Sequence, residues 1–333
     1  MLVAVDCGYG STKVLADNGH RASFPSVIAP PSDTGSVAVS ASTQSQRWRV
    51  QVDDQEPVLI AHAALNSPNG TRSWDEDAAE RAGYEALTYA AIRLVSPRGT
   101  VDVDLALGLP LAMYRQADLR RALRQKFNGR TVRVTLSGYE PVEFRLRRVA
   151  VYPQGAGVWY AATAYDPLLK DVPLGIVDIG YRTTDFLVMQ IGPSGGIEPR
   201  DDMADSAEIG VSDIYEHVAT KLQPMLGHPI SLQRVEAFDL WNNRKMVLHG
   251  EPFDLSDLMA DGAKTVAQRI QAEVGRAWKD EMGLLGGVVL AGGGAGWVQP
   301  HLRWRGTRSI LLDQPEYANA AGFLAILAAM CAR

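Results

Sequence analysis

The sequence has almost no cysteine. Cys7 and Cys331 are the only two in 333 residues, and they stand at opposite ends of the chain. They form no disulfide framework, and no Cys-x-x-Cys or His-x-x-x-His spacing indicates a metal site. Long apolar runs are also missing: the longest, 320–332, is too short to span a bilayer. Because no leader with a charged and then an apolar segment is present either, the sequence predicts a cytoplasmic protein with no membrane association.

The chain also lacks an excess of positive charge. It has 33 Lys and Arg against 38 Asp and Glu, a net charge of −5 and a pI near 5.7. We therefore expect no direct nucleic-acid binding, so that any contact with DNA runs through a partner protein. With 46% hydrophobic and 21% charged residues, the composition is typical of a globular protein, and the length suffices for two domains.

One short stretch is present twice. "VDCGYGSTKV" (5–14) and "VDIGYRTTDF" (177–186) both follow apolar runs and share the pattern Asp-x-Gly-Tyr-x-Ser/Thr-Thr. Each predicts a strand, a tight turn and a second strand. Helical patterns follow in both halves, so the repeat predicts two pseudo-equivalent domains that face one another.

The rest of the chain alternates between helical and strand patterns. Residues 30–47 are rich in Pro, Ser and Thr and predict an exposed, mobile loop, and 57–65 predict a small sheet element. The remaining predictions are strands at 101–110, 131–136, 142–153 and 286–294, and helices at about 75–94, 114–127, 155–165, 209–224, 254–282 and 317–330.

The two turns have the composition of a phosphate site. A turn of Gly, Ser and Thr presents backbone N–H groups and hydroxyls, which form a concave nest for anions. Asp6 and Asp178 precede the first glycine of each turn, and Mg²⁺ beside phosphate takes one or two carboxylates. Lys13 could neutralise phosphate oxygens. Either turn alone is more often an ordinary β-hairpin, but the matched pair favours a polyphosphate site.

A third glycine-rich stretch is "LAGGGAGWVQP", in which an apolar strand ends in Gly292, Gly293 and Gly294. Three glycines allow the backbone to approach a flat ligand closely. The stretch is neither a Walker A loop nor Gly-x-Gly-x-x-Gly. Alone it would be a strand-to-helix turn; beside two phosphate turns it favours contact with a nucleoside.

Together these motifs resemble the actin-like ATPases. "DCGYGSTK" resembles phosphate motif 1 and "DIGYRTTD" phosphate motif 2, while "VVLAGGGA" is similar to the adenosine motif. "YPQGAGVWYA" and "PEYANAAGFLA" are similar to the two connecting segments. In chain length and in the details of these motifs, the sequence is most similar to prokaryotic ParM-type plasmid-segregation actins and their archaeal relatives. Arg182 departs from the small residues expected in phosphate motif 2.

The resemblance implies an α/β, actin-like ATPase fold: two ribonuclease-H-like domains with nucleotide in the cleft between them. Domain I would comprise 1–153 and 315–333, with 22–72 as a small variable subdomain, and domain II would comprise 154–314. ATP or GTP with Mg²⁺ would be the cofactors. Gln154 would orient the attacking water, and Asp6 and Asp178 would hold Mg²⁺ through water. The implied nucleotide-binding residues are Gly8, Tyr9, Gly10, Ser11, Thr12, Lys13, Gly180, Tyr181, Arg182, Thr183, Gly292, Gly293 and Gly294.

The resemblance favours a filament-forming ATPase that segregates or positions DNA. Its expected partners are further copies of the same chain and a DNA-binding adaptor protein. A small-molecule kinase on the same fold is one alternative. It needs a carboxylate base near the transferred phosphate, and none follows Gln154 until Asp166. A non-polymerising actin-like scaffold is the other, but the terminal segment lacks the basic amphipathic face that membrane binding needs.

Overall fold

The computed structural model describes residues 1–31, 47–72, 82–192 and 195–331. The chain forms two compact units: unit 1 comprises Met1–Ala164 and Tyr317–Arg333, and unit 2 comprises Tyr165–Glu316. The domain limits that the resemblance implies, 153/154 and 314/315, stay a prediction. Each unit is described by itself below.

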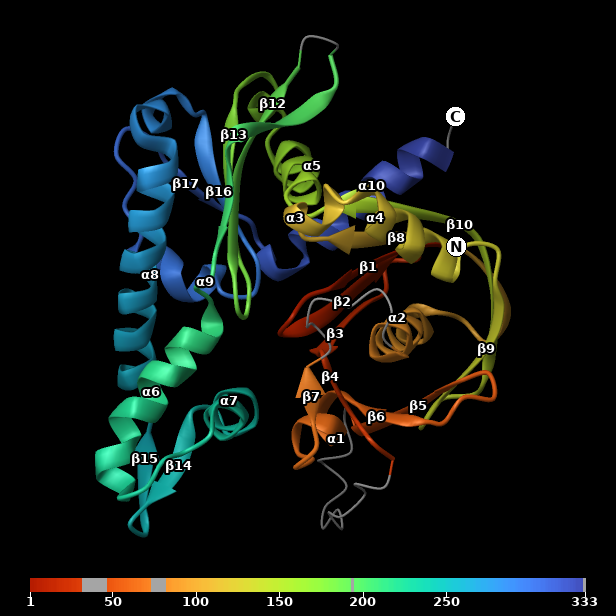
Figure 1. Ribbon diagram of the computed structural model, residues 1–333, viewed down its shortest axis with the longest axis horizontal. Coiled ribbons are helices and arrows are strands. Elements are labelled where there is room, and N and C mark those ends of the chain that lie inside the picture. Colours follow the sequence, from red (N-terminus) through yellow and green to blue (C-terminus); the bar gives the residue numbers. More distant parts are fainter. Residues whose placement is uncertain (32–46, 73–81, 193–194, 332–333) are drawn as a thin grey trace. The chain divides into compact units, whose positions relative to one another are not determined.

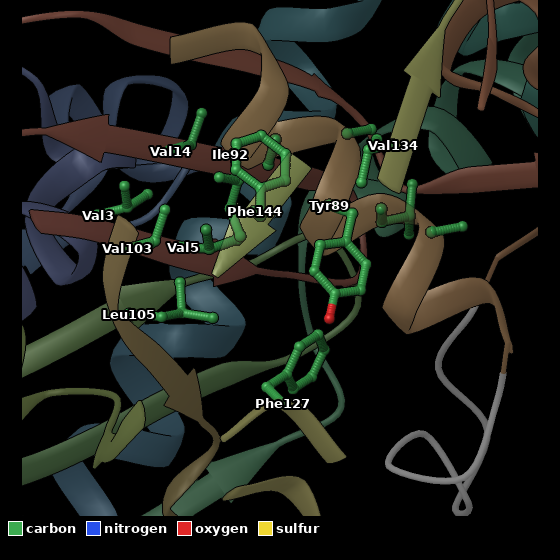
Figure 2. Packing of buried hydrophobic residues seen from close by; sticks show 14 of the residues in the cluster. Val3, Val5, Val14, Tyr89, Ile92, Val103, Leu105, Phe127, Val134 and Phe144 are labelled. Carbon is green, nitrogen blue, oxygen red and sulfur yellow. The ribbon is translucent and has the colours of Figure 1, made fainter. Parts of the chain in front are cut away.

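Unit 1 is built on the strand β1 (Leu2–Cys7), which is buried along almost its whole length. It pairs antiparallel with β2 (Ser11–Ala16) and parallel with β8 (Gly99–Leu109). Because side chains alternate along a strand, Val3 and Val5 face the core around α2 (Ala82–Val95), as Figure 2 shows. Ala4 faces the opposite side and packs with Phe323 of α10 (Ala318–Cys331). Helices thus cover both faces of the central strands.

The sheet of unit 1 continues far beyond its central strands and curls around α2 (Figure 1). The other described helices of unit 1 are α1 (Ala61–Leu65), α3 (Leu111–Tyr114), α4 (Ala117–Phe127) and α5 (Ala156–Tyr165). The ten described strands run in the order β3 (Arg21–Pro25), β2, β1, β8, β10 (Val142–Pro153), β9 (Thr131–Leu136), β5 (Arg47–Val52), β6 (Val58–Ile60), β4 (Val27–Ala29) and β7 (Thr71–Arg72).

The central strands of unit 2 pair in the same directions as those of unit 1. Its fully buried strand β11 (Leu174–Ile179) pairs antiparallel with β12 (Thr184–Ile191) and parallel with β16 (Gly287–Ala291). At the two edges of this sheet lie β13 (Ile197–Ala207) and β17 (Ser309–Leu311). Two strand-turn-strand pairs of the same geometry therefore stand beside a parallel strand, one in each unit.

Helices and a small hairpin complete unit 2. The long α8 (Ser256–Trp278) packs along α6 (Val211–Leu226), and buried apolar residues recur every three or four positions on α8. The other described elements are α7 (Leu232–Trp241), the hairpin of β14 (Lys245–Leu248) and β15 (Glu251–Asp254), α9 (Ala295–Val298), and 3-10 turns at Pro167–Asp171, Lys279–Leu284, Gln299–His301 and, at the boundary with unit 1, Pro315–Tyr317.

Most predicted elements lie where the sequence placed them, with end shifts of a few residues. One prediction is wrong in part, and one segment lacked a prediction. Residues 61–65 form the helix α1 rather than sheet, and only Val58–Ile60 form a strand. The segment 227–253 had no prediction, yet it holds α7 and most of the β14–β15 hairpin. Most of the loop predicted at 30–47 and the first turns of the helix predicted at 75–94 lie outside the described residues.

Among the described residues, no helix is both long enough and apolar enough to cross a bilayer.

Candidate functional site: two matched turns

The turn between β1 and β2, called turn 1 below, brings three predicted site residues together. Asp6 is the last but one residue of β1 and lies opposite Lys13 of β2 in the antiparallel register. Both side chains are buried, and Lys13 Nζ lies 3.8 Å from Asp6 Oδ2. The other carboxylate oxygen, Oδ1, accepts a hydrogen bond of 2.7 Å from Gln154 Nε2. A single carboxylate therefore orients both the ammonium group and the amide.

The backbone of turn 1 is closed by a hydrogen bond of 3.1 Å from the Gly8 N–H to the Ser11 carbonyl. A side chain at Gly8 would come within 3.0 Å of Lys13 Nζ, so glycine leaves the room in which the lysine folds back over the turn. Thr12 is fully buried, and its hydroxyl lies 2.8 Å from the Ser26 hydroxyl. The Thr12 hydroxyl therefore already has a hydrogen-bond partner within the protein, whereas Ser11 is part-exposed.

Two residues that sequence reasoning missed hold this region in place. Arg72 of β7 donates from Nη1 to the carbonyls of Tyr9 and Gly10, at 3.1 and 2.9 Å. Buried Asn319, at the start of α10, accepts from the Gly155 N–H at 2.9 Å and so fixes the residue after Gln154. Arg72 lies in none of the motifs quoted above, whereas Asn319 lies in "PEYANAAGFLA", a stretch that the sequence singled out without assigning a role to this residue.

The turn between β11 and β12, turn 2, has the same closure. The Gly180 N–H donates to the Thr183 carbonyl at 2.8 Å, and Asp178 is buried at the end of β11. The position opposite Asp178 carries Asp185, where turn 1 has Lys13. Burial raises the pKa of the Asp185 carboxyl above its usual range. In place of that lysine, turn 2 carries the exposed Arg182 at its tip.

The N-terminus of α6 is bonded directly to turn 2. The first N–H groups of this helix, on Val211 and Ser212, donate to the Gly180 and Tyr181 carbonyls at 3.1 and 2.7 Å. A Cβ on Gly210 would collide with the Tyr181 carbonyl, so this glycine allows the close approach. Turn 2 is thereby fixed by a helix that otherwise has unsatisfied donors at its start.

The three glycines predicted to approach a nucleoside divide into two kinds. Gly292 has φ +85°, and a Cβ there would collide with the Ile179 carbonyl and the Asp178 carboxylate. A Cβ on Gly294 would collide with the Ile179 side chain. A Cβ on Gly293 would meet nothing within 4 Å. Gly292 and Gly294 are therefore required by packing against β11, and Gly293 alone leaves space for a ligand.

A chain of polar contacts links turn 2 to the segment after these glycines. The Tyr181 hydroxyl donates to buried Glu236 of α7 at 3.0 Å. One turn further along α7, Asp239 accepts from Arg244 Nε at 3.0 Å. The Arg244 guanidinium stacks over the ring of Trp297 on α9, 4.3 Å from its centroid. The unpredicted helix α7 thus connects turn 2 with the glycine-rich stretch.

Cys7 provides a simple test of the packing beneath turn 1. It is fully buried beside Thr88, and burial raises the pKa of its thiol to about 12. At pH 8 almost no thiolate forms, so we expect the folded protein to react with a disulfide reagent only at half-buried Cys331. Two thiols should react after denaturation, and none in folded Cys331→Ser. Rapid labelling of Cys7 in the folded protein would contradict this packing.

Comparisons with known proteins agree with this architecture. A model for the N-terminal domain of actin-like proteins matches residues 4–157. A second model, for the C-terminal domain of MreB-like archaeal actin homologues, matches 176–304. The first range contains turn 1 and Gln154, and the second contains turn 2 and the three glycines. The chain therefore belongs to the actin-like proteins.

The similarity to individual proteins extends over nearly the whole chain. An archaeal actin homolog of Thermoplasma acidophilum is 25% identical over 97% of both chains. A 15-stranded ParM filament from Clostridium botulinum has a TM-score of 0.81 at 20% identity, covering 98% of this chain and 99% of that one. An archaeal actin homolog in complex with ADP has a TM-score of 0.79 at 20% identity and the same coverage. The predicted fold class, an actin-like α/β fold, is confirmed.

Proposed function

We propose that this protein is an ATPase that binds Mg-ATP through turn 1 and turn 2 and assembles into filaments. The observation that carries the proposal is the repetition of one turn geometry in both units. In each, a glycine N–H bonds to a Ser or Thr carbonyl, at 3.1 and 2.8 Å, and a buried Asp is the last but one residue of the preceding strand. Two nests of this kind suit the two sides of one polyphosphate.

The residues of turn 1 fit the phosphate groups and the metal. Lys13 is held beside the turn by Asp6 and can neutralise phosphate oxygens. Asp6 and Asp178 supply hard carboxylate oxygens, the donors that Mg²⁺ prefers. Bound Mg²⁺ would neutralise the charge that develops on the phosphates.

Gln154 would position the attacking water. Its Nε2 donates to Asp6, which fixes the plane of the amide and leaves Oε1 to accept a hydrogen bond from water. An amide takes no proton at neutral pH, so its contribution is orientation. Hydrolysis would therefore be slow until the geometry improves, for example on assembly. A slow, assembly-dependent hydrolysis suits a polymer that times its own disassembly.

The kinase alternative finds no support at Asp166, the first carboxylate after Gln154. Asp166 Oδ1 caps a 3-10 turn by accepting from the Leu168 N–H at 3.1 Å, and Oδ2 lies 3.7 Å from Arg308 Nη2. A carboxylate engaged in this way is a structural group rather than a general base. We propose that the filament segregates or positions DNA through an adaptor protein, as the resemblance to ParM-type actins implies.

Light scattering at 90° with parallel phosphate release tests the proposal. After Mg-ATP is added to the purified protein, scattering should rise above a critical protein concentration and decay as phosphate appears. A parallel run with GTP establishes the nucleotide preference, and excess EDTA should suppress both signals. Flat scattering while ATP is bound would contradict the filament, and absence of nucleotide binding would contradict the whole proposal.

A further inference from the structure

The two units carry opposite net charge. Unit 1 has 19 Lys and Arg against 16 Asp and Glu, a net charge of +3. Unit 2 has 14 against 22, a net charge of −8. The net charge of −5 for the whole chain is therefore distributed very unevenly between the two units. Such asymmetry favours association of unlike units of different copies.

The positive charge of unit 1 is concentrated around α4. Residues 111–135 contain seven Lys and Arg and a single acidic residue, Asp118. Lys126 and Arg130 are satisfied inside the unit, because both pair with the buried carboxylate of Glu85.

Three other arginines, Arg120, Arg121 and Arg124, lie on one side of α4 and are called the basic stripe here. Arg120 stacks on the ring of Tyr114, 4.8 Å from its centroid. Arg121 has only a long, exposed contact of 3.7 Å with Asp118. Within the described part of the chain, Arg124 has no acidic partner. Like charges four residues apart repel on a helix, so the basic stripe costs stability unless an external acidic partner balances it.

The negative charge of unit 2 is concentrated on β13. Residues 198–208 contain five acidic residues and one basic residue, Arg200, which pairs with Asp202 and Glu281. β13 is an edge strand of its sheet, and all five acidic side chains are exposed.

Beside β13 lies a groove of about 440 Å³, lined by the strand's end and by α8. Two exposed carboxylates, Asp205 and Glu208, border it, and half-buried Glu273 lines it but is paired with Arg276 at 2.9 Å. The one basic residue of its lining, Arg269, is paired with Asp213. The groove, called the acidic groove here, therefore presents unbalanced negative charge in a concave surface.

We propose that the acidic groove of one copy binds the basic stripe of the next. A convex helix that carries exposed arginines matches a concave surface bordered by carboxylates in both shape and charge. The two surfaces lie on different units and differ from one another, so the contact is heterologous and leaves one free surface of each kind at the ends. Such a contact repeats head to tail and produces an open chain unless it closes into a ring. This inference rests on the proposed filament function and names the partner surfaces for it.

A charge-swap experiment tests the pairing. Variant B is Arg121→Glu with Arg124→Glu, and variant A is Asp205→Lys with Glu208→Lys. In a solution of one variant alone, the reversed surface of each copy meets a native surface of the same sign on the next copy. We therefore expect the critical concentration in the Mg-ATP scattering assay to rise at least tenfold. In an equimolar mixture, every reversed basic stripe can meet a reversed acidic groove, and every native surface can meet a native one. The mixture should therefore assemble near the wild-type critical concentration.

The controls separate this proposal from the proposed function. Arg303→Glu with Arg305→Glu makes the same change in net charge as variant B, at exposed positions that belong to neither surface, and should assemble like the wild type. Fluorescent-nucleotide titration and thermal unfolding should show that both swap variants are folded and bind nucleotide. Wild-type assembly is scored first. If the wild type binds nucleotide and fails to assemble, the filament function is wrong and this pairing falls with it.

Three results with an assembling wild type would overturn the pairing alone. In the first, both variants assemble normally; in the second, each fails and the mixture fails too. In the third, variant B assembles normally but loses binding to double-stranded DNA that the wild type shows at low salt. That result would assign the basic stripe to a nucleic acid instead of a second copy.

Discussion

Gln154→Ala is expected to slow hydrolysis of bound ATP by about 10²-fold while nucleotide affinity stays close to that of the wild type. The reason lies in the hydrogen bond of 2.7 Å from Gln154 Nε2 to Asp6 Oδ1. That bond holds the amide in one orientation, so a water on Oε1 would be placed before the reaction begins. Alanine leaves turn 1 intact and removes only this placement.

Single-turnover hydrolysis with enzyme in excess measures the chemical step, and titration with a fluorescent nucleotide measures binding. Gln154→Glu is a sharp companion variant, because a carboxylate cannot donate to Asp6 at neutral pH. It should therefore be slow as well, although its size is almost unchanged. Gln223→Ala, at an exposed amide on α6, is the matched control and should behave like the wild type. Loss of binding with an unchanged hydrolysis rate would make Gln154 a structural residue.

The two turns were the part of the site that the sequence predicted best. The pattern Asp-x-Gly-Tyr-x-Ser/Thr-Thr fixes a strand end, a tight closure and a second strand, and these are local features. The structure contains both, with the same glycine-to-carbonyl hydrogen bond. Local chemistry of this kind is encoded by neighbours in the chain, so spacing alone is sufficient to locate it.

What individual residues do inside a motif depends on distant neighbours. The Thr12 hydroxyl bonds to Ser26, and Gly292 is glycine because Asp178 and Ile179 leave no room for a side chain. Nothing in either motif distinguishes these structural positions from those with space for a ligand, such as Gly293. Arg72 and Asn319 were missed for the same reason, because their partners at turn 1 and near Gln154 are remote in sequence.

The connection through α7 was not predictable from local signals either. Apolar residues in this ten-residue helix define no clear face, and a Ser231 cap is weak evidence alone. The turns that follow place non-glycine residues at positive φ, including Asn243, Arg244 and His249. Turn prediction relies on glycine at such positions, so the turn at 242–244 between α7 and β14 carried no signal. Packing against α6 and turn 2 therefore determines this region.

Trp278→Ala is expected to lower the free energy of unfolding by about 4 kcal/mol, in the range measured for large aromatic residues in cores. The side chain is 1% exposed, and its Nε1 donates to the Met203 carbonyl at 3.0 Å. Its ring meets Phe186 edge to face at 6.2 Å between centroids. One residue thus joins α8 to β12 and β13, and alanine would leave both a cavity and an unpaired carbonyl. Urea unfolding followed by circular dichroism measures the loss, and Leu284→Ala, 71% exposed, is the control.

Gly175 makes this prediction sharper, because a Cβ there would come within 2.7 Å of the Trp278 ring. Gly175→Ala alone should therefore cost about 1–3 kcal/mol through overpacking. In the Trp278→Ala background the added methyl group enters the cavity, so its cost should fall by at least about 1 kcal/mol. Equal costs in the two backgrounds would mean that the ring does not rest on Gly175. A positive coupling would identify the contact between β11 and α8 as one of the determinants of the fold that positions turn 2.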